Sequence, residues 1–442
     1  MGPIYDILII GCGMSGAIAA LTALKKGLSV CIVEQRVRHL IGKKCCGELM
    51  PQETLFWLEK EFNMTIPFYP LQRLQICTLE EHARCPYSLA GIIINQPLCT
   101  IDRYTVQQNM VAGLLKRGAV LHHGTVVAPV GTTRIEGVKT KESHTLKGKV
   151  VIDCSGTSSV LSSHVAFAGL LPPRAVGIAY KETLTLREPM ESKVASIIMD
   201  LNVGFSQYMW CFPKSPHHLN AGIGGLSTSR SDLLQKFKTV LHAHPFKISS
   251  RKDRGFGTLP LSGPAPCAVG PGLLLCGDAA GHVNPLTGEG IDPAIRAGYC
   301  AGTVAARAIR KDDLSVKALW PYNCEIARKP GIVHMSFLLL REFLRSLRPE
   351  HIQFLLSTIL SGDTLEQLET NTLSGMQKFY IALRGLKKPD LLFRLFFFSK
   401  TMEKLRLLYD RYPAHANGFP NWLMTFQSIV HTYEHTRLFP FN

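Results

Sequence analysis

The chain has 442 residues, of which 46% are hydrophobic and 19% charged, so it can bury a sizeable core and is not a disordered protein. Its formal charge of +16, from 49 Lys and Arg against 33 Asp and Glu, favours an anionic partner. The basic residues are scattered rather than gathered in a tract with aromatics, which argues against nucleic acid. The 13 cysteines form no Cys-x-x-Cys pair, and no apolar stretch reaches the roughly 18 residues of a membrane span. We therefore expect a cytoplasmic protein with free thiols and no metal site.

The first elements are predicted to be a strand, a glycine turn, a helix and a second strand. Residues 11–16 read Gly-Cys-Gly-Met-Ser-Gly between an apolar run and a stretch of helix formers, and the second strand ends at Glu34. In such a βαβ unit Gly11 allows the tight turn, Gly13 lets the backbone approach a pyrophosphate, and Gly16 lets the helix pack on the strand. Glu34 accepts hydrogen bonds from an adenosine ribose and repels a 2′-phosphate, so FAD or NAD fits better than NADP. Ser15 and Gln35 complete this predicted site.

Farther along the chain, β-rich runs interrupt the pattern of a nucleotide-binding domain. We expect an α/β fold with a Rossmann-like domain in three segments, an inserted antiparallel β-sheet domain and a helical C-terminal region. The Rossmann-like domain is assigned to residues 1–65, 100–165 and 265–330, the β-rich domain to 66–99 and 166–264, and the helical region to 331–442.

A second motif follows a buried strand at residues 273–276. Asp278 comes directly after this strand, and Gly288-Glu289-Gly290-Ile291 then opens a helix. Asp278 at this turn would hold ribityl hydroxyls, while the N–H groups around Gly288, Gly290 and Ile291 would face the flavin edge or the pyrophosphate. Taken alone, Asp278 is equally compatible with a simple helix N-cap. Paired with the first motif, it favours FAD over NAD.

Together these motifs resemble the flavoproteins of the p-hydroxybenzoate hydroxylase type. The resemblance implies that Arg103 lies near the FAD and that Val127, or its neighbour Val126, belongs to the strand that contacts adenine. Residues 153–156, Asp-Cys-Ser-Gly, look like the third characteristic stretch of these proteins, with Cys154 in place of the more usual Ala. The alternative for Arg103 is a surface arginine at the start of a helix.

Three further segments resemble the geranylgeranyl reductases within that superfamily. Residues 208–213, Tyr-Met-Trp-Cys-Phe-Pro, are similar to their Tyr-x-Trp-x-Phe-Pro pattern, and residues 45–48, Cys-Cys-Gly-Glu, are similar to the Cys-Gly-Glu loop that the family places near the flavin ring. Residues 257–260 resemble the glycine–proline turn before the Gly-Asp motif. The resemblance spans roughly residues 4–325 and implies that Cys46 and Gly47 contact the cofactor.

The aromatic segment has a chemical use. On an alternating strand, Tyr208, Trp210 and Phe212 share one face and form either a wall for an apolar chain or ordinary sheet core. An isolated alkene accepts hydride poorly unless it is protonated, and Tyr208 and Trp210 would stabilise the resulting positive charge. Reduced flavin would deliver hydride from N5 and a nearby acid the proton. Cys46 is the first candidate for this acid, although Cys45 can take its place in the register or either can be inert.

These inferences predict an FAD-dependent reductase that hydrogenates geranylgeranyl chains, in archaeal-type ether-lipid precursors. Glu48 is the weaker candidate for the acid and fits a loop contact better. The substrate would be a prenylated lipid or geranylgeranyl diphosphate, and the electron donor a ferredoxin or NAD(P)H. The C-terminal helices would cover a tunnel, or rest on anionic lipid headgroups at the inner face of the cell membrane, or simply complete the core.

Two other functions stay open. One is a flavin-dependent aromatic monooxygenase or halogenase, although Tyr208 and Phe212 depart from the Trp-x-Trp-x-Ile-Pro pattern of halogenases. The other is a non-catalytic protein that binds prenyl lipids, against which the retained Glu34 and Asp278 argue.

Overall fold

The structure is a computed structural model that describes residues 2–78, 92–94, 96–170, 175–190, 193–199, 207–226, 229–242, 246–355 and 388–437. Residues 79–91 and 356–387, which belong to the predicted β-rich segment 66–99 and helical segment 331–442, lie outside the described residues.

An eight-stranded sheet forms the first layer, and its central strands are the apolar, β-branched runs of the sequence. The strands β18, β11, β1, β2 and β8 are parallel neighbours in this order, so that β1 lies at the middle with both faces buried. The antiparallel β17, β10 and β9 extend it. The bounds are β1 (Ile4–Ile10), β2 (Val30–Glu34), β8 (Val120–His123), β9 (Val126–Val130), β10 (Gly137–Thr140), β11 (Thr145–Asp153), β17 (Val269–Gly270) and β18 (Leu273–Leu275).

Helices cover this sheet because their small residues allow close contact. Helix α1 (Met14–Lys25) packs along α6 (Ile291–Arg310), and a Cβ on Gly298 of α6 would lie 2.4 Å from the Ser15 carbonyl oxygen. Helix α4 (Arg103–Lys116) begins after the N-cap Asp102, whose side chain accepts a 2.7 Å hydrogen bond from the Thr105 amide. Helix α2 (Gln52–Phe62) buries Leu55 and Leu58 in the same core. The glycine turns are thereby held at the carboxyl ends of the parallel strands.

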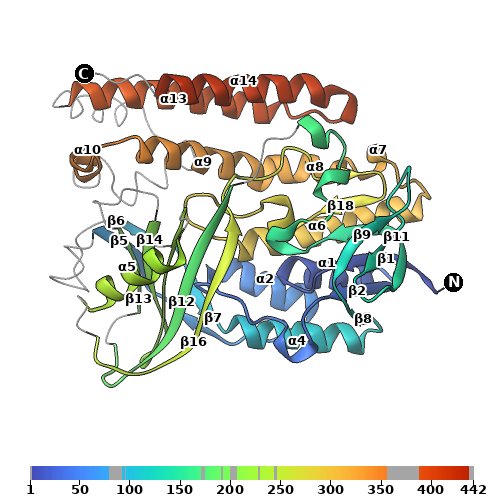
Figure 1. Ribbon diagram of the computed structural model, residues 1–442, viewed down its shortest axis with the longest axis horizontal. Coiled ribbons are helices and arrows are strands. Elements are labelled where there is room, and N and C mark those ends of the chain that lie inside the picture. Colours follow the sequence, from blue (N-terminus) through green and yellow to red (C-terminus); the bar gives the residue numbers. More distant parts are fainter. Residues whose placement is uncertain are drawn as a thin grey trace.

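A seven-stranded sheet stands beside the first, as Figure 1 shows. Its strands run antiparallel in the order β16-β12-β15-β14-β13-β5-β6, except that β13 and β5 are parallel. Helix α5 (Arg230–His242) covers one face with buried Leu233 and Phe237, which leaves the opposite face for a cavity. The bounds are β5 (Arg73–Thr78), β6 (Ile92–Ile94), β12 (Val176–Leu186), β13 (Val194–Met199), β14 (Gln207–Ser215), β15 (His218–Gly225) and β16 (Ile248–Pro260). A small sheet of β3 (Leu49–Pro51), β7 (Leu98–Ile101) and β4 (Phe68–Pro70) joins the two larger ones.

The C-terminal part is helical and has its own core. In Figure 1, α13 (Pro389–Asp410) and α14 (Phe419–Arg437) form an outer layer above α9 (Ile332–Arg345). Aromatic rings fill this core, with Tyr409, Trp422 and Phe426 in contact and the rings of Trp422 and Phe426 stacked at 5.5 Å. The shorter helices are α7 (Val316–Leu319), α8 (Pro321–Ile326) and α10 (Pro349–Phe354).

This architecture confirms the predicted fold class: a Rossmann-like domain, an inserted and mainly antiparallel sheet, and C-terminal helices. Within the part of the chain that the structure describes, no helix combines the length and apolarity needed to cross a bilayer.

Candidate active site

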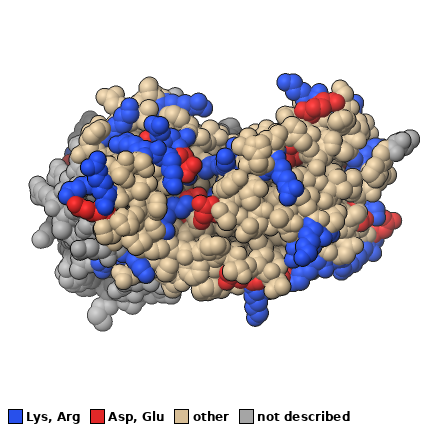
Figure 2. All heavy atoms as spheres, turned by 90° about the horizontal axis from the view of Figure 1, so that it is seen from below, with Lys and Arg blue, Asp and Glu red and all other residues tan. Residues whose placement is uncertain are grey.

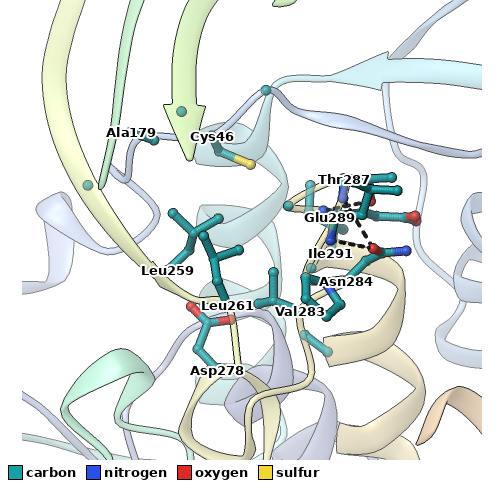
Figure 3. A pocket seen from close by; sticks show the side chains of 18 of the residues that line it. Cys46, Ala179, Leu259, Leu261, Asp278, Val283, Asn284, Thr287, Glu289 and Ile291 are labelled. Carbon is teal, nitrogen blue, oxygen red and sulfur yellow. Dashed lines mark hydrogen bonds between the residues drawn. The ribbon is translucent and has the colours of Figure 1, made fainter. Parts of the chain in front are cut away.

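One cavity of about 2510 Å³ runs between the three parts of the molecule. Its lining comes from the glycine turn of β1–α1, the turn after β18, the free face of the seven-stranded sheet, and helices α9 and α13. Figure 3 shows a close view in which Cys46, Asp278 and the turn at residues 284–291 surround the same space. Segments that are far apart in the sequence therefore build a single site.

At the first turn, the start of helix α1 faces the cavity. Its N-cap is Gly13, no side chain caps it, and its first turn carries no acidic residue, so its amides are free to bind an anion. Gly11, Gly13 and Ser15 line the cavity. Gly16 does not, because it packs against the strand: a Cβ there would lie 2.0 Å from the Gly11 carbonyl oxygen.

Glu34 lies beside this turn at the end of β2. Its carboxylate accepts hydrogen bonds from the Cys12 amide at 2.7 Å and the Arg36 amide at 2.8 Å, which fix its position. Each carboxylate oxygen keeps a further lone pair, which a ribose hydroxyl can use. Glu34 and the adjacent Gln35 both line the cavity.

The second turn lies beside the first, since a Cβ on Gly277 would lie 2.4 Å from the Ser15 hydroxyl oxygen. Asp278 forms an ion pair with Lys44, at 2.5 Å between carboxylate and ammonium. Burial would raise the pKa of Asp278, but the Lys44 charge holds it below its ordinary value. Helix α6 then begins at Ile291 after an N-cap glycine, Gly290, again without a side-chain cap.

The loop before α6 is held by side-chain hydrogen bonds. Asn284 accepts bonds from the Leu286 amide at 3.0 Å and the Thr287 amide at 3.1 Å (Figure 3). Gly288, Gly290 and Ile291 line the cavity at this loop.

Most of the other residues that were predicted to contact the cofactor line the cavity, and one of them lies at the surface. Arg103 is buried, lines the cavity and donates to the Gly42 carbonyl at 3.3 Å, so it is not a surface arginine. Cys154, Ser155 and Gly156 also line the cavity. Val126 lines it too, whereas Val127 is 60% exposed and does not line it, so of the two only Val126 is placed to contact a ligand in the cavity.

These features fit a dinucleotide cofactor. Two uncapped helix N-termini suit a pyrophosphate and a flavin edge, and the carboxylates of Glu34 and Asp278 suit ribose and ribityl hydroxyls. A Cβ at Gly13 would meet no protein atom within 4 Å, so the backbone leaves room for a ligand there. The residues at these two turns would thus be able to hold FAD.

The aromatic wall, which we define as Tyr208, Trp210 and Phe212 of β14, lies on the cavity face of the second sheet. The ring centroids are 6.3 Å apart for Tyr208 and Trp210 and 6.4 Å apart for Trp210 and Phe212. The intervening residues Met209 and Cys211 point into the core under α5. The Trp210 indole lies over β15, where a Cβ on Gly222 would lie 2.1 Å from its ring. The wall is therefore preformed and faces the cavity.

The loop at residues 44–48 crosses the cavity face of the sheet. Gly47 lies against Phe212, since a Cβ there would come within 2.9 Å of its ring. Cys46 lies close enough to Tyr208 to influence its pKa, which burial, Glu289 and Cys46 all raise. Cys45 packs against Gly257 instead, and burial raises its pKa to about 12. The two cysteines thus take different positions, and Cys46 is the one beside the aromatic wall.

A buried polar network joins this loop to the wall, and the sequence did not reveal it. Asn220 of β15 is fully buried; it accepts from the Trp210 indole at 2.9 Å and donates to the Cys46 carbonyl at 2.9 Å and to Glu48 at 3.1 Å. Glu48 in turn pairs with Lys214 at 2.5 Å. No sequence pattern marks Asn220 or Lys214, because their partners come from distant segments.

Beyond the wall, the cavity continues into an apolar region. Side chains of α9 and α13 line it, among them Phe337, Leu340, Leu344, Leu395, Phe398 and Met402. Several charged residues of α13, including Arg406 and Asp410, also border the cavity. A long apolar chain can therefore extend from the aromatic wall toward the C-terminal helices.

Comparison with known proteins agrees with this geometry. The family model of the FAD dependent oxidoreductases matches residues 6–171. The chain is 26% identical to a digeranylgeranylglycerophospholipid reductase of Sulfolobus acidocaldarius, over 96% of this chain and 97% of that protein. It is 28% identical to digeranylgeranylglycerophospholipid reductase 1 of Methanococcoides burtonii, over 81% of this chain and 88% of that protein.

Solved structures show the same fold. A geranylgeranyl bacteriochlorophyll reductase-like protein from Thermoplasma acidophilum superposes with a TM-score of 0.71 at 21% identity, covering 89% of this chain and 99% of that one. The flavin-dependent brominase Bmp2 superposes with a TM-score of 0.56 at 16% identity, covering 98% of this chain and all of that one. The cofactor of the present protein is FAD. The chain is an FAD-dependent oxidoreductase that is similar over most of its length to digeranylgeranylglycerophospholipid reductases.

Proposed function

We propose that this protein hydrogenates the carbon–carbon double bonds of geranylgeranyl chains, and that its substrates are ether-lipid precursors of the archaeal type. One observation carries the proposal: a single cavity connects the two cofactor turns to the aromatic wall and then to an apolar region beneath α9 and α13. The names of the relatives from Sulfolobus acidocaldarius and Methanococcoides burtonii support the same substrate class.

The size of the cavity supports a long substrate. Pockets for small ligands usually measure about 300–1,000 Å³. The cavity here measures about 2510 Å³, enough for a dinucleotide together with an extended apolar chain. Its far end is lined by aliphatic and aromatic side chains of the C-terminal helices, which suit a prenyl chain better than a polar aromatic substrate.

In this mechanism the aromatic wall prepares the alkene. Reduced FAD supplies the hydride when it is bound. The faces of Trp210 and Tyr208 stabilise the positive charge that develops when the alkene is protonated, since an aromatic face attracts cations. The Tyr208 hydroxyl donates to the Thr287 carbonyl, so the ring is held between the sheet and the cofactor turn. The wall also excludes water, which would otherwise capture the cationic carbon.

Cys46 is the acid we propose for the protonation step. It lines the cavity beside Tyr208, and its carbonyl and thiol are both fixed by hydrogen bonds, from Asn220 and from the Glu48 amide. Glu48 is less suited, because its carboxylate is 5% exposed and is already engaged by Lys214, Asn220 and the Arg103 amide. In our assignment Glu48 orients the loop and Cys46 delivers the proton.

The test is anaerobic incubation of the dithionite-reduced, FAD-loaded protein with a geranylgeranylated lipid, followed by mass spectrometry. We expect the lipid mass to rise in steps of about two units, one hydride and one proton per double bond. The variant Cys46→Ala should bind FAD normally and lower the rate by about 100-fold or more. FAD-loaded protein that leaves every prenyl double bond intact would refute the proposal.

The same experiment separates the rival functions. A monooxygenase or halogenase would yield an oxygenated or halogenated product only when oxygen is admitted, a result that the fold shared with the brominase makes worth checking. A lipid carrier would bind the prenyl chain without changing its mass. Both outcomes are read from the same spectra.

We also propose a negatively charged electron donor, a ferredoxin, with NAD(P)H as the alternative. The formal charge of +16 supports this choice, and Lys and Arg are spread over the face shown in Figure 2 with fewer Asp and Glu between them. Stopped-flow reduction of the FAD by each donor decides between them, and a rate that falls with added salt favours ferredoxin.

Peripheral contact with a membrane is the last part of the proposal. Three phenylalanines of α13, Phe393, Phe396 and Phe397, are exposed on the helix that borders the cavity. Such side chains can enter the headgroup region of a bilayer and place the cavity near a lipid substrate. Co-sedimentation with anionic vesicles should weaken when Phe393 and Phe396 are both replaced by serine.

A further inference from the structure

Lys181 lies on the cavity face of strand β12, in a position that no motif indicates. Its strand partners are Gly255 on β16 and Gly222 on β15, and Gly222 in turn pairs with Trp210 on β14. Because residues directly opposite one another on paired strands share a face, Lys181 belongs to the same row as Trp210. Neither glycine has a side chain of its own beside Lys181; the place over Gly222 is filled by the Trp210 ring, and the place over Gly255 is open. Lys181 lines the cavity and yet is only 8% exposed.

The Lys181 ammonium has no ionic partner in the part of the chain that the structure describes. Lys44 pairs with Asp278 and Lys214 pairs with Glu48, whereas Lys181 forms neither an ion pair nor a hydrogen bond with the described residues. The adjacent Glu182 does not serve it, since that carboxylate binds Tyr180 and Arg251. The group that interacts with Lys181 is the Cys45 thiol, whose pKa burial raises to about 12 and which therefore stays neutral.

A cation that is largely withdrawn from bulk water and has no partner is costly, because it loses part of its hydration and gains nothing in return. The Lys181 side chain is 8% exposed, and its ammonium group is open to the cavity. Proteins retain such groups where a ligand supplies the opposite charge. Lys44 and Lys214 contribute to holding the cofactor turn and the 44–48 loop, but Lys181 has no structural task of this kind. Its side chain projects into the same space as the aromatic wall.

We propose that Lys181 binds an anionic oxygen group inside the cavity. Two sources provide such a group: a phosphate on the prenylated substrate, or the ring of the FAD once it is reduced and negatively charged. The choice of these sources rests on the proposed function, whereas the anion site itself rests on the burial and isolation of Lys181. A charge-assisted hydrogen bond in a partly dry cavity is strong enough to decide which ligand is bound.

The first experiment measures binding to the oxidised, FAD-loaded protein by calorimetry. The probes are farnesyl monophosphate and farnesol, which share one apolar tail and differ in the phosphate. We expect Lys181→Met to weaken binding of the monophosphate by about 10- to 100-fold, the loss of one charge-assisted hydrogen bond, and to leave farnesol unchanged. Lys181→Arg should retain the preference. Lys252→Met, on the neighbouring strand and exposed, is the control for an equal change of net charge.

The second experiment measures the midpoint potential of the bound FAD without any prenyl ligand. If the anion is the reduced ring, Lys181→Met lowers this potential and Lys181→Arg restores it, while the preference for the monophosphate stays as in the wild type. A loss of the preference for the monophosphate supports the anion site and identifies the substrate phosphate as its ligand. A lowered midpoint potential supports the site and identifies the reduced FAD ring.

Wild-type values for Lys181→Met in both experiments would overturn the proposal. Failure of the proposed function is seen separately, because both measurements are independent of turnover. A protein that shows the Lys181-dependent preference but leaves prenyl double bonds intact has the anion site and a different reaction.

Discussion

The two ends of the cavity are built by different means. At the cofactor end, backbone amides at the starts of α1 and α6 face the ligand, and short turns with glycine at set positions put them there. At the substrate end, the surface is made of side chains from β14, α9 and α13, which the fold brings together from separate segments. Recognition through the backbone leaves a local pattern in the sequence, because a tight turn restricts each position. Recognition through a side-chain surface leaves less of one. The aromatic run on β14 is a local pattern, but the apolar side chains of α9 and α13 follow no fixed spacing, since many apolar residues fill the same space.

The largest effect should come at the cofactor end, from Gly16→Ala. The added Cβ would lie 2.0 Å from the Gly11 carbonyl oxygen, so α1 has to move away from β1. We expect a loss of about 3 kcal/mol or more in the free energy of unfolding and loss of bound FAD. Chemical denaturation and the visible spectrum measure the two effects.

Gly13→Ala is the matched control, because its Cβ would meet no protein atom within 4 Å. Its FAD-free form should lose no more than about 1 kcal/mol, the usual cost at an N-cap, while FAD affinity falls by about tenfold or more. Equal destabilisation of the two FAD-free variants would show that the glycines differ less than the geometry indicates.

The next effect should appear at the substrate end, from Asn220→Leu. This change leaves the Trp210 indole, the Cys46 carbonyl and one bond of Glu48 without their partner. We expect about 2–3 kcal/mol less stability and a kcat about 10- to 100-fold lower, with little change in KM and normal FAD content. Steady-state kinetics alongside the flavin spectrum provide the measurement.

Asn220→Asp refines this result, because it keeps an acceptor for Trp210 but removes both donors and sets a carboxylate beside Glu48. If Asn220 acts by positioning the loop, this variant should show a shifted pH profile as well as a reduced kcat. A loss of FAD as large as that of Gly16→Ala would contradict the separation of the two ends.

A smaller effect is expected where the ends meet, from Tyr208→Phe. The Tyr208 hydroxyl donates to the Thr287 carbonyl and so links the aromatic wall to the cofactor turn. Because one neutral hydrogen bond is removed and the ring stays, stability should fall by about 1 kcal/mol and the rate by only a few fold. Thermal unfolding and single-turnover reduction measure these changes, and a variant without activity would mean that the hydroxyl itself takes part in the reaction.

The smallest effect concerns the pH dependence of the Lys44–Asp278 pair. Burial raises the pKa of Asp278 but Lys44 holds it below the ordinary value, so the pair stabilises the fold above about pH 4 and the contribution is lost as the pH falls through the lowered pKa. The difference in unfolding free energy between wild type and Asp278→Asn should be below about 1 kcal/mol, since Lys44 is partly exposed. Unfolding measured from about pH 3 to pH 8 should show a constant difference above about pH 5. A difference that grows toward low pH would contradict the direction of the shift.

Much of the cofactor end was predictable, and the comparisons support the predicted fold class, the FAD cofactor and the similarity to geranylgeranyl reductases. The structure brings Glu34, Asp278 and Arg103 to the same cavity. The choice of Val127 differs from the structure because an alternating strand presents either Val126 or Val127 to the ligand, and only the pairing of β9 decides which. The sequence also leaves open which of Cys45 and Cys46 lies beside the aromatic wall. In the structure Cys45 packs against Gly257, and Cys46 lies beside the wall.

By itself the sequence determined the βαβ glycine turn, its acidic partner, the Gly-Asp turn and the single-sided run of aromatics, because each depends on residues close together in the chain. Only the tertiary structure decided that Asn220 links Trp210 to the cysteine loop, that Glu48 is paired with Lys214, and that Lys181 has no partner among the residues that the structure describes. The physical reason is that a buried polar group is defined by what surrounds it, and its surroundings here come from several segments of the chain.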